Sequence, residues 1–117
     1  MSEKQPIRIT SQQGEGFRRV GFTGNVLVNA DHELGFSAIT VDVFGAHPLK
    51  QMVGATRSYF VLSGTGRFTL NGEEIKVAEG DLVVIPDGGI YKYAGIMKLF
   101  EFNVPATTSE HSITLEE

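Results

Sequence analysis

The sequence predicts an all-β domain, built from antiparallel strands that are connected by tight turns. Across residues 57–95, short apolar runs alternate with turn-forming residues, and each run is about as long as an ordinary strand. Asn71-Gly72 separates two alternating runs at 67–70 and 73–77, and this dipeptide is the strongest local signal for a hairpin. We therefore predict an antiparallel meander over 57–95, around which the rest of the chain completes a sheet.

Further turns divide the meander wherever Gly, Asn, Asp, Ser or Pro gather. They are expected at 63–66, 80–81 and 86–89. After the last of these, residues 97–103 form the expected final strand, and Pro105 ends it because proline cannot donate to the ladder.

The N-terminal half supplies the other strands. Residues 25–29 and 36–44 are rich in β-branched and apolar side chains, so both are predicted as strands, the second as a long central one. Residues 7–10 alternate and favour an edge strand, and 17–21 form a short turn or strand. The segment 45–56 has no clean period and is predicted as a loop or an irregular strand.

Size and composition limit the possible functions. The 117 residues form one domain, 1–117, with a core at about 20–104 between polar N-terminal and C-terminal tails. The absence of cysteine excludes disulfides and thiolate chemistry, and a net charge of −4 argues against nucleic-acid binding. No apolar run approaches the roughly 20 residues of a membrane helix, and no signal segment opens the chain. We expect a cytoplasmic protein with a small-molecule ligand.

Part of the meander resembles the second motif of the cupin superfamily. Gly80, Pro86 and Gly88 have the spacing of that motif, but Tyr91 stands where the motif has its histidine. Residues 59–66 resemble the strand and turn that close the first cupin motif. The resemblance covers about residues 36–104 and implies an antiparallel double-stranded β-helix, which is the jelly-roll barrel of cupins.

The resemblance also implies that the usual metal ligands are replaced. Counted from Gly45, the two histidines and the glutamate of the first motif fall at Gln51, Val53 and Arg57, and the second motif gives Tyr91. Val53 has no donor atom, and Arg57 places a permanent positive charge where a ligand would lie. We therefore expect no metal and no other cofactor, although a shifted register of the segment 45–56 would alter this assignment.

Strand alternation then places several side chains on the inner face of the barrel. If Arg57 takes the glutamate position, Tyr59 points inward with it, and Tyr91 and Tyr93 point inward from the second motif. The resemblance thus implies a ligand-binding pocket with Arg57, Tyr91 and Gln51, and it brings all three tyrosines together. A buried tyrosine hydroxyl needs a hydrogen-bond partner, which makes such a concentration unusual for mere packing.

His47 is the candidate proton carrier. It follows the long strand, where a cupin chain enters the mouth of its barrel, and a histidine pKa near 6.5 allows it to accept or donate a proton at neutral pH. The simpler alternative is a partly exposed loop histidine without a chemical role.

A narrower resemblance gives these residues roles. The chain is similar to the small metal-free cupin dehydratases of uridyl-peptide antibiotic biosynthesis, which act on a uridine 5′-aldehyde. The shared features are a His soon after the long strand, an aromatic strand ending in Ser-Gly at 63–64, and a Tyr two residues before Gly95. The family carries a lysine near its N-terminus, and the matching position here is Arg19, two residues after Phe17.

This resemblance implies that a proton is removed next to a carbonyl and that a β-hydroxyl leaves as water. His47 would be the base, Tyr93 the acid, Arg19 the cation beside the developing oxyanion, and Tyr59 a positioning hydroxyl. Arginine stays protonated, so Arg19 keeps the charge of the lysine but offers no proton transfer.

Three functions remain open at this point. The first is a metal-independent lyase, a dehydratase of a sugar-like or nucleoside aldehyde, or else a sugar isomerase or epimerase. The second is a non-catalytic cupin that binds a small polar or anionic ligand through Arg57 and Arg19. The third is a metal-dependent cupin with unexpected ligands.

The simpler alternatives for the site residues also stay open. Arg57 could form an ion pair with Asp42 or Glu101. Arg19 could be an exposed charge, and the tyrosines could be ordinary core residues. The sequence leaves open whether the protein is a monomer or a homodimer.

Overall fold

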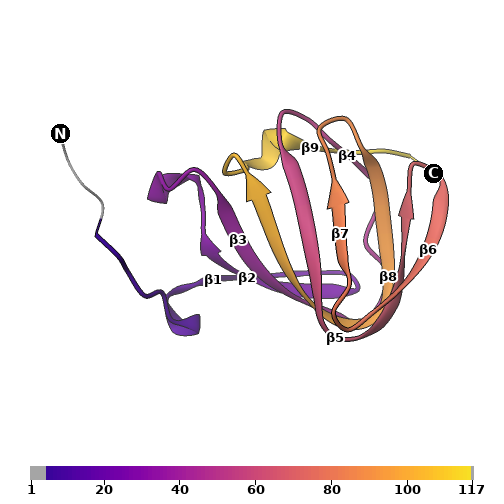
Figure 1. Cartoon of the computed structure of the whole chain (residues 1–117), viewed down its shortest axis with the longest axis horizontal. Coiled ribbons are helices and arrows are strands. Elements are labelled where there is room, and N and C mark those ends of the chain that lie inside the picture. Colours follow the sequence, from indigo (N-terminus) through magenta and orange to yellow (C-terminus); the bar gives the residue numbers. More distant parts are fainter. Residues whose placement is uncertain (1–4, 117) are drawn as a thin grey trace.

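The computed structural model describes residues 5–116, which form a curled antiparallel sheet of nine strands (Figure 1). The described residues contain no α-helix, and their helical segments are the short 3₁₀ turns η1 (Ser11–Gln13), η2 (Ala30–His32) and η3 (Ser109–His111). The all-β prediction is therefore confirmed. No helix in this part of the chain is long and apolar enough to cross a membrane. Residues 1–4 and 117, assigned above to the polar tails, lie outside the described residues.

The sheet is organised around its two longest strands, β5 and β8. The strands are β1 (Glu15–Arg19), β2 (Phe22–Val28), β3 (Ser37–Val43), β4 (Lys50–Met52), β5 (Thr56–Leu70), β6 (Glu73–Ala78), β7 (Leu82–Ile85), β8 (Ile90–Val104) and β9 (Ser112–Thr114). Hydrogen-bonded neighbours follow the order β1-β2-β3-β8-β4-β9, and β5 pairs with β6, β7 and β8. Because β8 joins these two groups of strands, the sheet closes around it into a half-barrel.

The predicted turn at 63–66 is wrong. β5 continues through it, with a shift of register between Val61 and Ser63, and pairs with β8 along nearly its whole length. Gly66 lies opposite Gly95, and a Cβ atom at Gly95 would lie 2.5 Å from the Cα atom of Gly66. The glycines therefore mark a close approach of two bending strands, which has the same local composition as a turn.

Most other strand predictions are confirmed. The predicted strand 25–29 largely coincides with the end of β2, the strand 36–44 with β3, and Asn71-Gly72 connects β5 to β6. Two predictions are wrong: residues 7–10 form no strand, and the C-terminal tail contains β9, which pairs with β4. β4 and β9 have three residues each, which is too short for alternation to be visible in the sequence.

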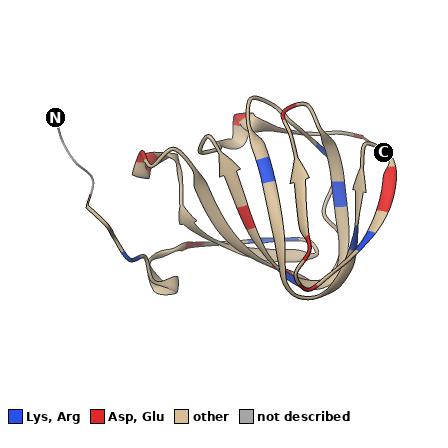
Figure 2. Cartoon of the chain, in the orientation of Figure 1, with Lys and Arg blue, Asp and Glu red and all other residues tan. Residues whose placement is uncertain are grey.

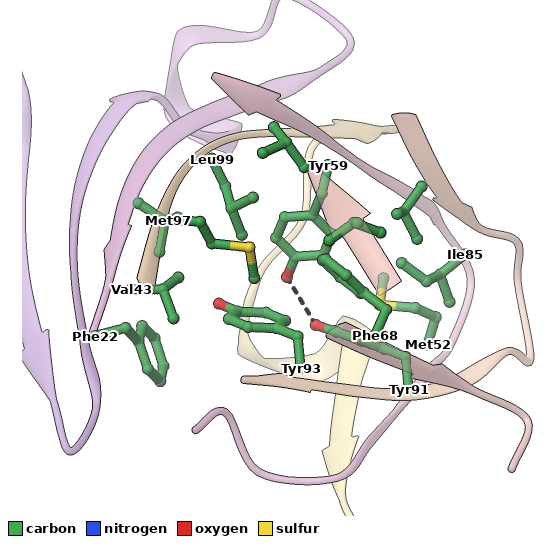
Figure 3. Close-up of a cluster of buried hydrophobic side chains, with 14 of the residues drawn as sticks. Phe22, Val43, Met52, Tyr59, Phe68, Ile85, Tyr91, Tyr93, Met97 and Leu99 are labelled. Carbon is green, nitrogen blue, oxygen red and sulfur yellow. Dashed lines mark hydrogen bonds between the residues drawn. The ribbon is translucent and has the colours of Figure 1, made fainter. Parts of the chain in front are cut away.

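The core lies on the concave face of the half-barrel. The largest fully buried side chains include Tyr59, Tyr91, Phe68, Met52 and Leu99, which come from β4, β5 and β8. The alternation predicted for β5 and β8 is thus confirmed, because the inward tyrosines are buried. The half-barrel is filled by aromatic, aliphatic and sulfur-containing side chains, as Figure 3 shows.

Candidate active site

Arg57 is the buried charge of the interior, and its donors are engaged by groups on β8. Its Nε atom donates to Oδ1 of Asn103 at 2.7 Å, and its Nη1 atom donates to the hydroxyl of Tyr91 at 2.9 Å. Nε also lies 3.4 Å from Oε2 of Glu101, so the ion pair left open by the sequence is present with Glu101. Burial alone lowers the pKa of Arg57, but Tyr59, Glu101 and Tyr91 outweigh it, and the guanidinium remains charged.

The three tyrosines form a second layer against Arg57. The hydroxyls of Tyr59 and Tyr91 point toward each other and are 3.0 Å apart, with Tyr93 beside them (Figure 3). Burial raises the pKa of all three phenols above the ordinary value of 10. At neutral pH each hydroxyl therefore keeps its proton and can donate a hydrogen bond.

Asn103 extends the network from Arg57 toward β3. Its Nδ2 atom donates to Oε2 of Glu101 and to Oγ of Ser37, both at 3.0 Å, and Ser37 Oγ lies 3.1 Å from Oγ1 of Thr107. Asn103 and Ser37 are buried, so each of their polar groups has a partner where an unpaired one would be costly. The network fixes the rotamers of the inward polar groups and holds the segment after β8 against the sheet.

His47 lies inside the half-barrel and not in an exposed loop. Its backbone N–H donates to the carbonyl of Tyr93 at 2.8 Å. Its ring stacks on the rings of Tyr93 and Tyr91, with centroids 4.5 and 5.2 Å away, and the ring of Phe22 lies 5.1 Å away. The side chain is more than nine-tenths buried, and Nδ1 has no hydrogen-bond partner among the described residues.

The surroundings keep His47 neutral. Burial, and next the positive charge of Lys50, lower the pKa of His47 from its ordinary 6.5 to about 3, although the neighbouring backbone of Pro48 acts in the opposite direction. A neutral imidazole at pH 7 has one nitrogen that can accept a proton. The chemistry open to His47 is therefore proton acceptance within an aromatic cage.

The register predicted for β4 is off by one residue. Lys50 pairs with Tyr91 and Met52 is fully buried, so these two side chains face inward. Gln51 instead donates from Nε2 to the carbonyl of Gly88 at 3.2 Å, and Val53 is exposed. Gln51 thus lies apart from the Arg57 network, and Lys50 is a site residue that sequence reasoning missed, since a three-residue strand carries no readable alternation.

Arg19 ends β1 at the mouth of the half-barrel. It is exposed, its guanidinium lies 5.0 Å from the ring centroid of Phe17, and its Nη1 donates to the carbonyl of Arg18. It lines a cleft of about 330 Å³, which also includes Ser37 and the segment 107–109. Ser37 therefore joins the wall of this cleft to the buried network around Arg57.

A second cleft reaches His47 from another side. It has a volume of about 400 Å³ and is lined by His47 and Tyr93 together with Arg67, Glu74 and Lys92. Both clefts have volumes at the lower end of the range that small ligands occupy, roughly 300–1,000 Å³. His47 and Arg19 thus lie in the walls of two different clefts, and Phe22 and Phe17 lie between them.

The donor set does not fit a cupin metal. A cupin metal is usually held by three histidines and one carboxylate. Two of these four positions are occupied here by Arg57 and Tyr91, and the nearby carboxylate of Glu101 is already paired with Arg57. Nowhere in residues 5–116 do three His, Asp or Glu side chains come together. We derive no step through a metal ion.

Comparison with known proteins agrees with this architecture. A family model described as a cupin domain matches residues 54–96. Pac13 from Streptomyces, in a variant with one tyrosine changed to phenylalanine and with uridine, superposes with a TM-score of 0.87 at 23% identity over 97% of this chain and 93% of its own. The chain has the cupin fold. Another structure of Pac13 describes that protein as a nucleoside dehydratase.

Other cupin-like structures share the fold at lower identity. KdgF from Halomonas sp. has a TM-score of 0.76 at 13% identity, over 91% of this chain and 99% of its own. A protein from Planctomyces limnophilus has a TM-score of 0.84 at 14% identity, over 92% and 96%. No curated protein matches the sequence. The cupin fold is therefore established by structure, and the activity has to be argued from the site.

Proposed function

We propose that this cupin is a metal-independent lyase, a dehydratase that acts in the cytoplasm on a sugar-like or nucleoside aldehyde. The observation that carries the proposal is the placement of His47. Its neutral ring stacks on Tyr93 and Tyr91, with an unpartnered Nδ1 atom and protonated phenols alongside. A base and an acid in contact, in a site largely closed to water, are the groups that elimination next to a carbonyl requires.

The proposed reaction uses these groups in sequence. His47 takes a proton from the carbon next to the carbonyl, and the electron pair of that C–H bond forms an enolate. The negative enolate oxygen is stabilised by Arg19, whose exposed side chain must turn past Phe17 and Phe22 toward His47 when the substrate binds. The enolate then expels the β-hydroxyl, which leaves as water with the proton of Tyr93, and the proton on His47 returns to Tyr93. Tyr59 positions the substrate through its hydroxyl.

One comparison supports the substrate class, and one observation on the site supports a mechanism without a metal ion. Pac13, with which this chain shares its fold, is described as a nucleoside dehydratase and has been solved with uridine. Two of the positions at which a cupin holds its metal carry Arg57 and Tyr91, and Arg57 donates a hydrogen bond to Tyr91. We therefore favour a uridine-type nucleoside as the ligand and a proton-transfer mechanism.

The test is turnover of uridine 5′-aldehyde by the purified protein. We expect loss of one water by mass spectrometry and a new absorbance from the conjugated aldehyde. His47→Gln should lower kcat by about 10²–10⁴-fold, which is the usual contribution of a general base, while uridine binding measured by calorimetry persists. Wild-type turnover by His47→Gln would rule the proposal out.

His32→Gln provides the matched control. His32 accepts from the backbone N–H of Asn29 at the start of η2, and glutamine can make the same capping contact. This variant should keep both the fold and the turnover of the wild type, so a loss seen in both variants would not report on catalysis.

A non-catalytic binding protein is the second candidate. It is favoured by the Arg57–Glu101 ion pair, which already neutralises the buried cation, and by the nearly complete burial of the tyrosines. That function predicts uridine binding without any change of the 5′-aldehyde. A product of unchanged mass would instead indicate a sugar isomerase or epimerase.

A further inference from the structure

Two cations at the mouth of the half-barrel lack an acidic partner within residues 5–116. Lys50 faces inward on β4, as shown by its pairing with Tyr91 and by the complete burial of Met52 two residues later. Arg19 lies opposite Phe22 on β2 and therefore shares the inner face of the sheet. The ion pairs of the described chain that involve Arg57, Arg67 and Lys98 include neither of them.

A chain of contacts links the two cations: Lys50 pairs with Tyr91, the ring of Tyr91 stacks on His47, and His47 lies 5.1 Å from Phe22, the partner of Arg19 on β2. The pKa of Lys50 is lowered, first by burial, then by the positive charges of Arg57 and Arg19, with Glu101 opposing. Glu101 is held by Arg57 and Asn103, and Glu15, the acid that lines the cleft of Arg19, is exposed and forms no ion pair in the described residues. The mouth is thus locally positive in a chain of net charge −4.

This local excess differs from the rest of the molecule. Figure 2 shows Lys and Arg interspersed with Asp and Glu along the strands and turns. On the outer surface, for example, Lys98 lies 3.6 Å from Asp42 and Arg67 lies 3.5 Å from Glu74. Unpaired like charges on the same inner face repel one another. A negative group bound between them attracts both, and the net electrostatic energy then becomes favourable.

We propose that the mouth binds an anionic group of the substrate, a carboxylate or a phosphate, between Lys50 and Arg19. Lysine supplies a mobile point charge, and arginine supplies a planar fork that suits oxygens of either group. The N–H donors of Arg19 that do not bond the carbonyl of Arg18 can serve this group and the developing oxyanion together. The inference deepens the proposed function, since it assigns a negative charge to the same substrate.

An anion at this place would also act on the base. The charge of Lys50 is one of the causes that lower the pKa of His47, and the buried Nδ1 atom has no partner in the described chain. A bound anion cancels that charge, raises the pKa of His47 toward its ordinary value and makes the imidazole a stronger base. Substrate binding and activation of the base are therefore linked.

The experiment compares neutral and anionic probes by calorimetry. Uridine, uridine 5′-monophosphate and uridine 5′-carboxylate are titrated into the wild-type protein, and ribose is compared with ribose 5-phosphate. We expect at least one anionic probe to bind about tenfold more tightly than its neutral parent, with a gain that shrinks as salt is added. The carboxylate and the monophosphate arms distinguish the two sources of charge.

Substitutions assign the gain to the two cations. Lys50→Met and Arg19→Met should each remove most of the preference for the anionic probe over its neutral parent. Arg18→Met, on the opposite face of β1, and Lys76→Met, an exposed lysine on β6, should keep the preference. Equal affinity for neutral and anionic probes, or a preference that survives both Lys50→Met and Arg19→Met, would overturn the proposal.

The outcome is separable from that of the turnover assay. Turnover of the neutral 5′-aldehyde without any anion preference overturns the anion site and leaves the dehydratase. A preference for ribose 5-phosphate over ribose that depends on Lys50 supports the anion site even when no 5′-aldehyde is consumed. Failure of the carboxylate and of both phosphates to bind more tightly than their neutral parents overturns it as well.

Discussion

Arg57 and Glu101 form an ion pair whose side chains are only 10% and 9% exposed. Removing one partner of such a pair leaves the other charge buried without compensation. We expect Arg57→Met to lower the free energy of unfolding by about 3–5 kcal/mol, measured by urea denaturation.

The double variant Arg57→Met with Glu101→Gln tests the reason for this loss. It removes both charges, so part of the stability lost in Arg57→Met should return even though a second contact is gone. If the double variant is less stable than Arg57→Met by the whole loss that Glu101→Gln causes alone, the two charges are not coupled.

The contact between Arg57 and Tyr91 permits a second test at the same scale. Their side chains meet end to end at 2.9 Å, so Arg57→Glu combined with Tyr91→His places a shorter carboxylate and a shorter imidazole on facing positions, close to Glu101. We expect zinc affinity to rise by about tenfold over the wild type, since both are zinc ligands. Chelator competition measures it, and no gain over the single substitutions would mean that the new side chains do not converge.

Among single residues, sequence reasoning succeeded where a strand is long. Tyr59, Tyr91 and Tyr93 lie on strands of 15 residues, and their common inward direction follows from alternation and the cupin-like spacing. Lys50 lies on a strand of three residues, where a shift by one position reverses which side chain faces inward. Sequence reasoning therefore places Gln51 and Val53 at two cupin ligand positions, whereas Lys50 and Met52 are the residues of this segment that face inward.

At the level of elements, the close approach of β5 and β8 gives a prediction. Gly95→Ala would bring the new Cβ atom within 2.5 Å of the Cα atom of Gly66 and 2.7 Å of the carbonyl oxygen of Thr65, at a φ of +151°. Because both contacts are with backbone, neither strand can yield cheaply. We expect the free energy of unfolding to fall by about 2–3 kcal/mol, measured by urea denaturation.

Gly88→Ala separates strain from crowding. Gly88 also has a positive φ, +88°, but a Cβ atom there would meet nothing within 4 Å. Its substitution should cost only about 1 kcal/mol, through backbone strain alone. Equal losses for the two variants would mean that the approach of β5 and β8 is not what requires glycine at 95.

The close approach of β5 and β8 also explains which elements could be located from the sequence. Asn71-Gly72 is a true hairpin, and Gly72 has the positive φ that such a turn requires. The glycines at 64 and 66 have a similar local composition, but they serve strand bending against β8, which lies about 30 residues further along the chain. Local composition cannot tell a turn from a bend whose cause lies on another strand.

For the whole molecule, the site is assembled from distant segments. Arg19, Lys50, Arg57 and Glu101 come from β1, β4, β5 and β8, and only the closure of the sheet brings their charges together. The cupin-like motif made the barrel predictable, because it fixes spacing within the two strands that carry it. The basic mouth has no such signature, since it depends on how far the sheet curls.

Closure also makes stability depend on pH through His47. Its pKa is about 3 in the folded protein against 6.5 in its ordinary state, so between these values the unfolded chain binds a proton that the folded chain does not. The free energy of unfolding therefore rises with pH in this window. The stability that neutral His47 contributes is fully present above pH 6.5, and it is lost progressively as pH falls toward 3.

Urea denaturation at pH 7 and pH 5 measures this dependence. The wild type should lose about 2 kcal/mol over this interval, at about 1.4 kcal/mol per pH unit below 6.5. His47→Gln has no proton to bind, so its loss should be smaller by that amount, and the difference between the two proteins removes the shared effects of groups such as Glu101 and Lys50. Parallel losses in both proteins would show that His47 titrates in the folded state as it does in the unfolded chain, and the aromatic cage would then be open to water.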